Sequence, residues 1–350
     1  MNMTTLSWIS CTYILLFLAC VGAALARRQH GISMDGLTLK KTLIVDQSGH
    51  GDFTTVQAAI DYIPSNNSDN ILVHIKPGIY HEKVLIPREK PFVTLRGEGM
   101  HTTRIEWNEC LYEDQTPLNV LADNFVATGI GFVNTYNYPR RPIGVPRLPA
   151  TAAKVSGDKA IFSRCGFFGL QDTLWDDHGR HYFKDCRVEG AVDFIYGAGQ
   201  SIYEDCVVQV NADQLEFGLA GFITAQGREN RNDTNGFVFH RGTLNGTGST
   251  YLGRAWRPYA RVLFYQTHID EDIVPLGWDC WTAYGREEQL TFAELDCDGP
   301  KYDTSGRVDW AIVNSTRRVS EMLSLAYIDT EGWTKPFSEC QPPCTLQIND

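Results

Sequence analysis

Short apolar runs separated by turn residues make up most of the chain from Leu43 onward. The runs hold three to five residues, as in segments 71–75, 84–86 and 93–95, and Gly, Asn or Asp stands between neighbouring runs. Runs of this length and composition are typical of β-strands. One stretch, Thr55–Ile63, instead has apolar residues at helical spacing and predicts a short amphipathic helix.

An aromatic residue followed three positions later by a cysteine recurs at a nearly constant interval. The copies are Phe162-Ser163-Arg164-Cys165, Phe183-Lys184-Asp185-Cys186 and Tyr203-Glu204-Asp205-Cys206, and their cysteines are 21 and 20 residues apart. A repeat near 20 residues is typical of a solenoid, in which each coil stacks on its neighbours. We therefore predict an all-β fold, a single parallel β-helix (solenoid) whose amino-terminal end is covered by the helix, with a β-sandwich as the alternative.

Two aspartates hold the same place in successive repeats. Asp172 lies seven residues after Cys165, and Asp193 lies seven residues after Cys186. In coils stacked in register these side chains would be about 5 Å apart, so one carboxyl would hold its proton near neutral pH. An acid beside a base is a catalytic arrangement. Aspartates are also common at solenoid turns, where they cap the backbone, so the spacing alone leaves a structural role open.

We see no linker that divides the chain into two domains. The first 26 residues carry no charge and end in a small-residue cleavage motif, which predicts a signal peptide over 1–26, with an uncleaved anchor as the alternative. We expect residues 27–40 to be loosely held, 41–335 to form the β-helix, and 336–350 to be a Cys- and Pro-containing tail. No later stretch is long and apolar enough to span a membrane.

Eight cysteines follow residue 26, an even number that suggests disulfides in an exported chain without fixing their pairing. Only Cys340-Gln341-Pro342-Pro343-Cys344 has close spacing, and no second pair or histidine cluster accompanies it, so we predict no metal site. Four Asn-x-Ser/Thr sequons are compatible with glycosylation, at Asn66, Asn232, Asn245 and Asn314.

The net charge is −11, which disfavours nucleic acid and anionic membranes as partners, because phosphate contacts need clustered Lys and Arg. Such a chain would also repel a heavily ionised polysaccharide and tolerate a neutral, esterified one better.

Six sequence blocks resemble, in order, the signature blocks of plant pectin methylesterases. They are Gly78-Ile79-Tyr80-His81-Glu82, Val155-Ser156-Gly157-Asp158-Lys159-Ala160, Gln171-Asp172-Thr173-Leu174, Asp193-Phe194-Ile195-Tyr196-Gly197, Ile223-Thr224-Ala225-Gln226-Gly227-Arg228 and Leu252-Gly253-Arg254-Ala255-Trp256. The resemblance covers nearly the whole chain after the signal peptide. It implies a right-handed parallel β-helix without the amino-terminal inhibitor-like region that many relatives carry.

The same resemblance implies a function: hydrolysis of the methyl esters of homogalacturonan to carboxylates and methanol, without a cofactor. It implies a secreted, monomeric enzyme of the plant cell wall, and a proteinaceous pectinesterase inhibitor as a further partner. Polygalacturonase or pectate lyase activity is disfavoured, since these would need a cluster of three aspartates, or calcium-binding carboxylates with a basic proton acceptor.

Roles for individual residues also follow from the resemblance. Asp193 resembles the nucleophile that forms an acyl-enzyme, and Asp172 the acid that protonates departing methanol and then activates water. Gln171 resembles an oxyanion donor. Arg254 resembles the arginine beside the nucleophile, where a cation keeps Asp193 ionised while Asp172 stays protonated.

Aromatic side chains are expected to bind sugar faces, and the candidates are Trp175, Tyr196, Trp256 and Trp278, each with core packing as the alternative role. A disulfide between Cys186 and Cys206 is predicted from their spacing on adjacent coils and from the bridge that relatives carry at the matching positions. Cys165 is one coil away and could compete.

One position departs from the family pattern. Relatives usually read Gln-Ala-Val-Ala-Leu, and their glutamine is a second oxyanion donor, whereas this chain reads Pro149-Ala150-Thr151-Ala152-Ala153. Proline has neither a side-chain donor nor a backbone N–H, and losing an oxyanion donor typically slows an enzyme by about 10²–10³-fold. We therefore expect a slow esterase, with a catalytically silent pectin-binding homologue as the alternative.

Overall fold

The structure is a computed structural model that describes residues 33–34, 37–111, 115–139, 146–313 and 318–338. The predicted signal peptide, the sequon at Asn314, and Cys340 and Cys344 lie outside these residues. In the described part of the chain, no helix is long and apolar enough to cross a membrane.

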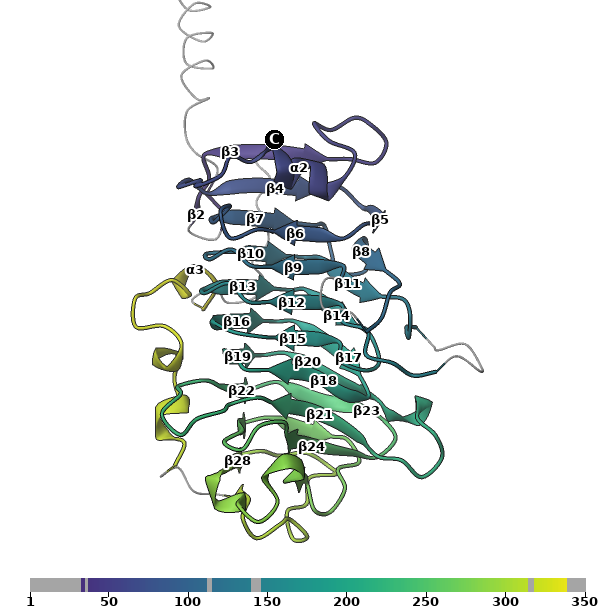
Figure 1. Cartoon of the computed structure of the whole chain (residues 1–350), viewed down its shortest axis with the longest axis vertical. Helices are drawn as coiled ribbons and strands as arrows, with labels where there is room; N and C mark the ends of the chain where they lie inside the picture. Colours follow the sequence, from purple (N-terminus) through teal and green to yellow (C-terminus); the bar gives the residue numbers. More distant parts are fainter. Residues whose placement is uncertain (1–32, 35–36, 112–114, 140–145, 314–317, 339–350) are drawn as a thin grey trace, which may run out of the picture.

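The described chain winds in turn through three parallel sheets, and each circuit forms one coil of a right-handed parallel β-helix (Figure 1). A strand of the first sheet is followed by one of the second and one of the third, after which the chain returns to the first. The fold predicted from the 20-residue repeat is confirmed, and the β-sandwich alternative is wrong.

The strands of the first sheet are β3 (Lys41–Val45), β4 (Ile71–Ile75), β7 (Val93–Arg96), β10 (Val126–Thr128), β13 (Ala160–Ser163), β16 (Arg180–Lys184), β19 (Gln200–Glu204), β22 (Gly236–His240), β25 (Arg261–Tyr265), β28 (Thr291–Leu295) and β29 (Ile312–Val313). The second sheet contains β5 (Gly78–His81), β8 (Thr103–Trp107), β11 (Gly131–Asn134), β14 (Gly166–Phe168), β17 (Arg187–Gly190), β20 (Val207–Asn211), β23 (Thr243–Thr247) and β26 (His268–Asp270). The third sheet contains β6 (Val84–Ile86), β9 (Leu118–Val120), β12 (Ala153–Val155), β15 (Leu174–Asp176), β18 (Val192–Gly197), β21 (Gly221–Gln226), β24 (Thr250–Ala255) and β27 (Trp278–Asp279).

The other described elements are short. They are the antiparallel pair β1 (Ser33–Met34) and β2 (Leu37–Thr38), helices α2 (Val56–Tyr62) and α3 (Lys335–Ser338), and the 3₁₀ turns η2 (Ala212–Gln214), η3 (Trp281–Ala283), η4 (Glu287–Gln289), η5 (Ser320–Met322) and η6 (Leu325–Tyr327).

Helix α2 confirms the predicted amphipathic helix and packs on the first coils of the solenoid (Figure 1). Thr55 caps it, accepting a hydrogen bond from Ala58 N at 3.3 Å. The Glu82 carboxylate accepts two further bonds from Val56 N and Gln57 N, at 2.9 and 2.8 Å. These bonds satisfy amide groups that a helix start otherwise leaves unpaired.

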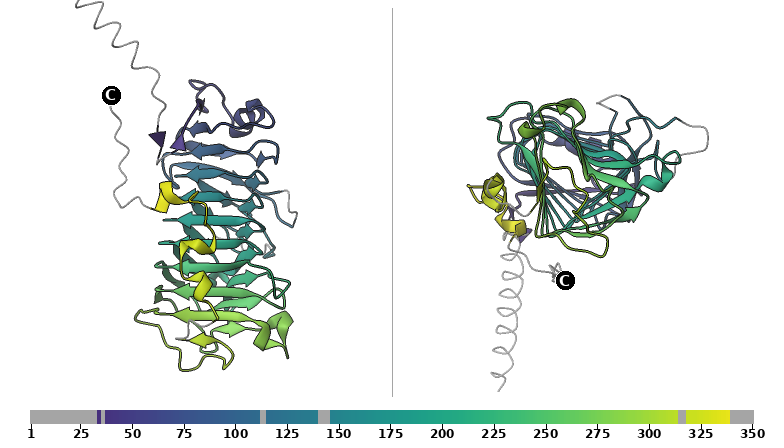
Figure 2. Two further views of the ribbon diagram at one scale, coloured as in Figure 1. Left: turned by 90° about the vertical axis from the view of Figure 1, so that its left-hand side faces the viewer. Right: turned by 90° about the horizontal axis from the view of Figure 1, so that it is seen from below.

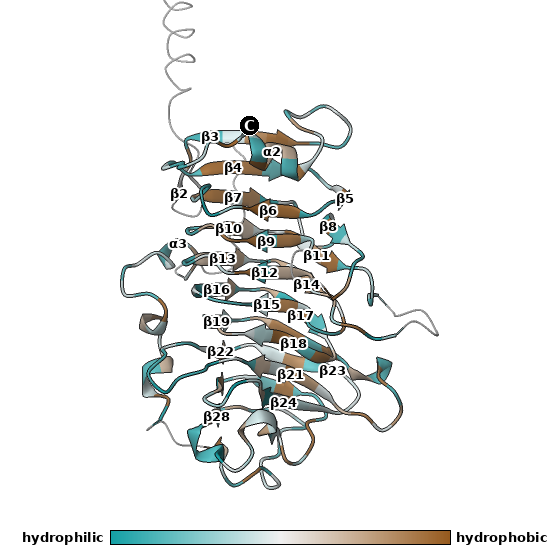
Figure 3. Cartoon of the chain, in the orientation of Figure 1, coloured by the Kyte–Doolittle hydropathy of each residue, from teal (hydrophilic) through white to brown (hydrophobic). Residues whose placement is uncertain are grey.

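The aromatic residues of the repeat stack as a column inside the solenoid. Phe162 pairs in register with Phe183, and Phe183 with Tyr203, with ring centroids 5.2 and 4.4 Å apart. Phe239 and Phe264 extend the column at 4.8 and 4.5 Å. The amino-terminal coils continue the core with aliphatic residues in place of aromatic ones, and their strands, such as β4 and β7, are hydrophobic (Figure 3). The repeat recognised in the sequence is therefore the core repeat of one coil.

The predicted disulfide is absent, since Cys186 and Cys206 are both free, buried thiols, as is Cys165. Cys186 Sγ donates to Phe162 O at 3.3 Å, and Cys206 Sγ donates to Phe183 O at 3.4 Å. Stacked coils hold equivalent positions about 4.8 Å apart, whereas the Cβ atoms of a disulfide lie about 3.8 Å apart. In place of a bridge, each of the two thiols donates to a main-chain carbonyl of the preceding coil.

The carboxyl-terminal segment runs along the outside of the solenoid over the first sheet (Figure 2). Its apolar residues Val319, Met322 and Ile328 pack on outward-facing residues of the sheet, including Tyr182 and Leu263. The outer face of the first sheet is thereby covered along this segment, so it is not open to a ligand there.

Candidate active site

Asp172 and Asp193 occupy the same place on neighbouring coils, as the spacing predicted. The backbone of Gln171 bridges to that of Val192, and Leu174 pairs with Ile195. Asp172 and Asp193 lie between these two paired positions and are therefore in register. Both have left-handed backbones, with φ of 58° and 47°, a conformation that Asp adopts more readily than most residues. Each aspartate lies where its chain enters the third sheet, and Asp193 is only 8% exposed.

Arg254 reaches back over two coils to Asp193. It lies in β24, in line with Ala225 of β21 and Tyr196 of β18. Arg254 Nε donates to Asp193 Oδ1 at 2.8 Å, and Arg254 Nη2 donates to Asp193 Oδ2. A guanidinium bound to both carboxylate oxygens is a strong and geometrically specific pair.

The two carboxyls differ in their electrostatic surroundings. Burial, together with the adjacent Asp193 charge, raises the pKa of Asp172 to about 8 against the opposing pull of Arg254. Burial also raises the pKa of Asp193, but the hydrogen bonds and charge of Arg254, with a smaller contribution from Arg147, oppose it. Asp172 is therefore the group that holds a proton at neutral pH, and Asp193 is the group whose ionised form is directly bound by a cation.

Two aromatic rings that were not predicted hold Arg254 between them. The guanidinium carbon lies 4.3 Å from the Phe222 ring centroid and 4.0 Å from the Trp281 ring centroid. Tyr251 stacks on Phe222 at 4.8 Å. Arg254 pairs with Asp279 on the next coil, and this register brings Trp281, two residues further along the chain, within reach of the guanidinium.

A pocket of about 230 Å³ opens beside Asp172. It is lined by Glu109, Cys110, Leu111, Pro149, Thr151, Asp172, Trp175, Tyr196 and Trp256. The pocket thus brings together three of the predicted aromatic residues, Trp175, Tyr196 and Trp256. It also contains the candidate acid Asp172 and Pro149, the residue that differs from the family pattern. Trp175 and Tyr196 stack at 5.3 Å, and Trp256 meets Tyr196 edge-on at 6.0 Å.

Trp278 does not belong to this pocket, and the prediction that it binds sugar is wrong. It is 1% exposed, stacks on Phe292 at 4.6 Å, and donates from Nε1 to Glu294 Oε1 at 3.1 Å. Strand residues alternate between faces, so when Arg254 and Asp279 point outward, their neighbours Gly253 and Trp278 point inward.

The remaining predicted residues are also placed. Gln171 is half-buried, directly precedes Asp172, and forms a backbone bridge with Val192 of the next coil. Of the sequon asparagines, Asn66 and Asn232 are exposed and Asn245 is half-buried in β23. Among the described residues, no group of three His, Cys, Asp or Glu side chains is placed to hold a metal ion.

Comparison with known proteins identifies the family. Residues 42–330 match the family model described as "Pectinesterase". "Probable pectinesterase 55" of Arabidopsis thaliana is 49% identical over 296 residues, which are 84% of this chain and 90% of that protein. "Probable pectinesterase 29" of the same plant is 48% identical, over 85% and 89% of the two chains. The solved "Pectin methylesterase from Carrot" is 28% identical, with a TM-score of 0.75 over 82% of this chain and 92% of that one. This chain therefore belongs to the pectinesterase family of carboxylic ester hydrolases.

Proposed function

We propose that this protein hydrolyses the methyl esters of homogalacturonan, leaving free carboxylates and releasing methanol. The observation that carries the proposal is the stacked pair Asp172 and Asp193, with Arg254 bound to both oxygens of Asp193. Burial raises the pKa of one carboxyl to about 8, and a cation holds the other, so acid and nucleophile are distinguished before substrate arrives. The names of the relatives support the same substrate class.

In the first half of the reaction, an Asp193 oxygen attacks the ester carbonyl carbon and forms a tetrahedral intermediate. Gln171, which directly precedes Asp172, donates a hydrogen bond to the oxyanion. The intermediate collapses as the bond to the methoxy oxygen breaks, and Asp172 gives its proton to the departing methanol. The product of this half is an anhydride between Asp193 and the galacturonate.

In the second half, the Asp172 carboxylate takes a proton from water, and the hydroxide attacks the galacturonate carbonyl. The bond to Asp193 breaks, which frees the galacturonate unit as its carboxylic acid and restores both aspartates to their starting states. The product then loses its proton to solvent and becomes a carboxylate. Arg254 stabilises the returning Asp193 charge through the same two hydrogen bonds.

Pro149 is proposed to slow this cycle. It lines the catalytic pocket with Asp172, at the position where relatives place a second oxyanion donor. Proline has no hydrogen-bond donor, so Gln171 is the one side chain assigned here to donate to the oxyanion. The complete set of Asp172, Asp193 and Arg254 argues for a slow enzyme rather than the silent pectin-binding homologue.

We further propose that residues 1–26 direct secretion and are removed, and that the mature monomeric protein modifies the plant cell wall. Glycosylation at the four sequons and binding of a proteinaceous pectinesterase inhibitor belong to the same proposal. Segment 27–40 and the tail 336–350 would then flank the catalytic β-helix of residues 41–335.

The test is release of methanol from highly methyl-esterified pectin by the purified, secreted protein, with a pectin-binding assay beside it. Methanol release that the Asp193→Asn variant lacks supports the proposal. Pectin binding without methanol would identify the silent homologue instead.

A further inference from the structure

Two insertions of the solenoid meet beside the candidate active site. The first follows β11, ends before β12 and includes residues 146–152. The second lies between β20 and β21 and covers residues 212–220. Arg147 of the first insertion lies 3.5 Å from Glu216 of the second, measured between Nη1 and Oε2. An ion pair therefore joins the two insertions.

The ion pair spans two coils of the solenoid. Ala150 N of the first insertion donates to Gln171 O at 3.1 Å, and Asp172 N donates to Val192 O at 3.0 Å. Val192 pairs in turn with Phe222, at the start of β21. The four segments therefore lie side by side, and the inner two carry the aspartates of the candidate site. The ion pair that connects the outer two lies beside these aspartates.

Both partners of the pair are held by their surroundings. Leu148 O accepts a hydrogen bond from Asn137 Nδ2 at 2.7 Å, which fixes the main chain next to the arginine. Leu215, next to the glutamate, packs on the apolar cluster that contains Val192. The place of the ion pair is therefore set by the fold of both insertions.

Arg147 and Arg254 approach Asp193 from opposite directions along the strand. Arg254 lies in the row of Tyr196, three residues past Asp193. Arg147 instead precedes Ala150, which belongs to the row just before Asp193. Its Nη1 atom is buried and forms no hydrogen bond with the described residues. The charge of Arg147 lowers the pKa of Asp193, in addition to the larger effect of Arg254.

The acids around Asp193 are few, and one of them is already paired. Asp172 is its neighbour on the preceding coil, and Glu109 is exposed in the lining of the catalytic pocket. Glu189, four residues before Asp193, accepts a hydrogen bond from Arg187 Nε at 2.5 Å. With Glu216, these are the negative charges against which Arg147 acts.

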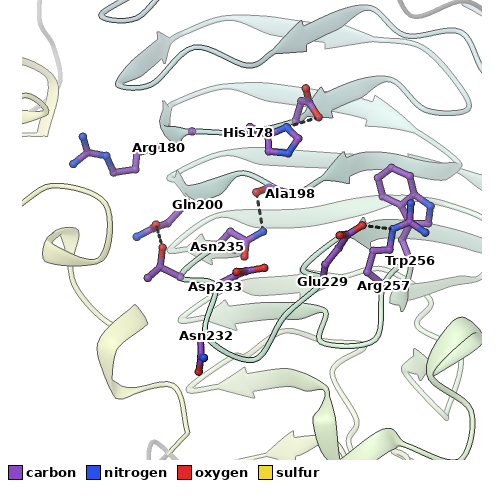
Figure 4. Close-up of a pocket in the computed structure, with 14 residues that line it drawn as sticks. His178, Arg180, Ala198, Gln200, Glu229, Asn232, Asp233, Asn235, Trp256 and Arg257 are labelled. Carbon is purple, nitrogen blue, oxygen red and sulfur yellow. Dashed lines mark hydrogen bonds and ion pairs between the residues drawn. The ribbon is translucent and has the colours of Figure 1, made fainter.

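The other cations near the catalytic pocket are engaged away from Asp193. Lys154 Nζ lies 3.8 Å from the Trp175 ring centroid and 3.9 Å from Asp177 Oδ2. In the hollow of about 850 Å³ that begins at Trp256, Arg257 Nε lies 3.2 Å from Glu229 Oε1 (Figure 4). In the described chain, Arg147 is therefore the cation best placed, after Arg254, to act on Asp193.

We propose that Arg147 is a positioning residue of the esterase, which Glu216 holds beside Asp193 so that its charge favours the ionised nucleophile. Arg147 acts through Asp193 and does not line the pocket beside Asp172. The nucleophile is then held by two cations, one from each direction. This inference rests on the proposed esterase function and assigns a role to two insertions that lie outside the sequence blocks shared with the family.

Arg147→Gln tests the inference through the pH profile of kcat/KM for methanol release. Without this charge Asp193 keeps its proton to higher pH, so the acid limb should move up by roughly 0.5–1 pH unit. The alkaline limb, set by Asp172, should stay in place. Arg147→Lys retains the charge and should recover part of the shift.

Arg88→Gln is the matched control, because Arg88 is exposed and follows β6, four coils away from β18. An acid limb in Arg147→Gln that coincides with that of Arg88→Gln would overturn the inference. A loss of rate that is equal at every pH would do the same, since it would indicate a general loosening of the site.

Glu216→Ala separates positioning from simple charge. Removal of a negative charge alone would make Asp193 easier to ionise and move the acid limb down. Loss of the anchor should instead let Arg147 turn away and move the limb up, as in Arg147→Gln. Asp213→Ala is the control from the same insertion, since the Asp213 carboxylate accepts a hydrogen bond from Thr247 Oγ1 at 2.6 Å, and it should not move the limb up. A downward shift in Glu216→Ala would refute the role of Glu216.

Failure of the proposed function would be distinguishable, because the wild type would then release no methanol at any pH. The inference would in that case be tested by carbon-13 NMR titration of the aspartate carboxyls, with Asp193 assigned by its loss in Asp193→Asn. Arg147→Gln should raise the measured pKa of Asp193 by the same amount. An unchanged titration would refute the effect of Arg147 on Asp193.

Discussion

Arg254 and Asp193 form a bidentate ion pair across two coils of the solenoid, with Arg254 Nε 2.8 Å from Asp193 Oδ1. The guanidinium lies between the rings of Phe222 and Trp281, so its hydrogen-bonding edge has little freedom to turn away. Asp193 is consequently held by a cation that the rigid third sheet positions in advance. Preorganised charge of this kind avoids reorganisation at the moment of reaction.

Asp193→Asn should abolish methanol release while leaving the fold intact, because an amide of the same shape is not a nucleophile. Asp172→Asn should also cripple turnover, since it removes both the acid of the first step and the base of the second. Methanol release and circular dichroism check the two effects. If Asp193→Asn kept more than about a tenth of the wild-type rate, Asp193 would not be the nucleophile.

Phe222→Ala should lower kcat and move the acid side of the pH–rate profile to higher pH. The reason is that Arg254 lowers the pKa of Asp193, and a loosened guanidinium does so less effectively. Cation–π contacts contribute about 0.5–2 kcal/mol, so a loss of roughly tenfold in kcat is expected. Tyr62→Ala is the control, since it removes a cation–π contact to Lys41 on the amino-terminal coil. Identical profiles for the two variants would show that Phe222 does not position Arg254.

Activity should fall as pH rises past about 8. Burial and the Asp193 charge raise the pKa of Asp172 to about 8, and the first step requires Asp172 protonated. Below that pH, the rate should fall again where Asp193 gains a proton and ceases to be a nucleophile. The profile of kcat/KM for methanol release measures both sides, and full activity persisting at pH 10 would contradict the role of Asp172.

The stacked aspartates could be predicted from sequence because the coils around them keep a strict length. Residues 165, 186 and 206 mark equivalent points, and no insertion separates them from Asp172 and Asp193. The aromatic column follows for the same reason, since the coils that carry the repeat place Phe162, Phe183 and Tyr203 in register. Local repetition here fixes long-range contacts.

Insertions and side-chain direction explain what the sequence did not reveal. The turns after Asn211 and Gln226 lengthen the coils, so the register of β24 with β27 was hidden, and with it the inward side of Trp278 and the place of Trp281. The disulfide predicted between Cys186 and Cys206 is absent for a different reason. Sequence spacing places two residues on adjacent coils, but it does not show whether their Cβ atoms approach within bonding range.

Asp172→Asn should stabilise the protein at neutral and mildly alkaline pH although it destroys activity. The folded pKa of Asp172 is raised above the unfolded value of 3.8, to about 8, so between these values the folded state binds the extra proton. Stability of the wild type therefore declines with rising pH in that window, by at most about 1.4 kcal/mol per pH unit, and an amide removes this decline. Melting temperatures at pH 5 and pH 8 measure it, with the exposed Asp309→Asn as control. A variant whose melting temperature tracked the wild type at both pH values would contradict the prediction.

Pro149→Gln should raise kcat, by up to roughly 10²-fold if the restored amide reaches the oxyanion. Pro149 lines the pocket beside Asp172, and its backbone is fixed on both sides: Leu111 N donates to Pro149 O at 2.9 Å, and Ala150 N donates to Gln171 O at 3.1 Å. A glutamine should therefore keep the main chain in place.

The gain should appear in kcat more than in KM, because the new contact forms mainly in the transition state. Pro149→Ala is the matched control: it removes the ring without adding a side-chain amide, so any gain that it shares with Pro149→Gln comes from relief of the ring alone. Circular dichroism and melting must match the wild type in both variants. A well-folded Pro149→Gln enzyme with wild-type kcat would mean that another group already serves the oxyanion and that Pro149 does not limit the rate.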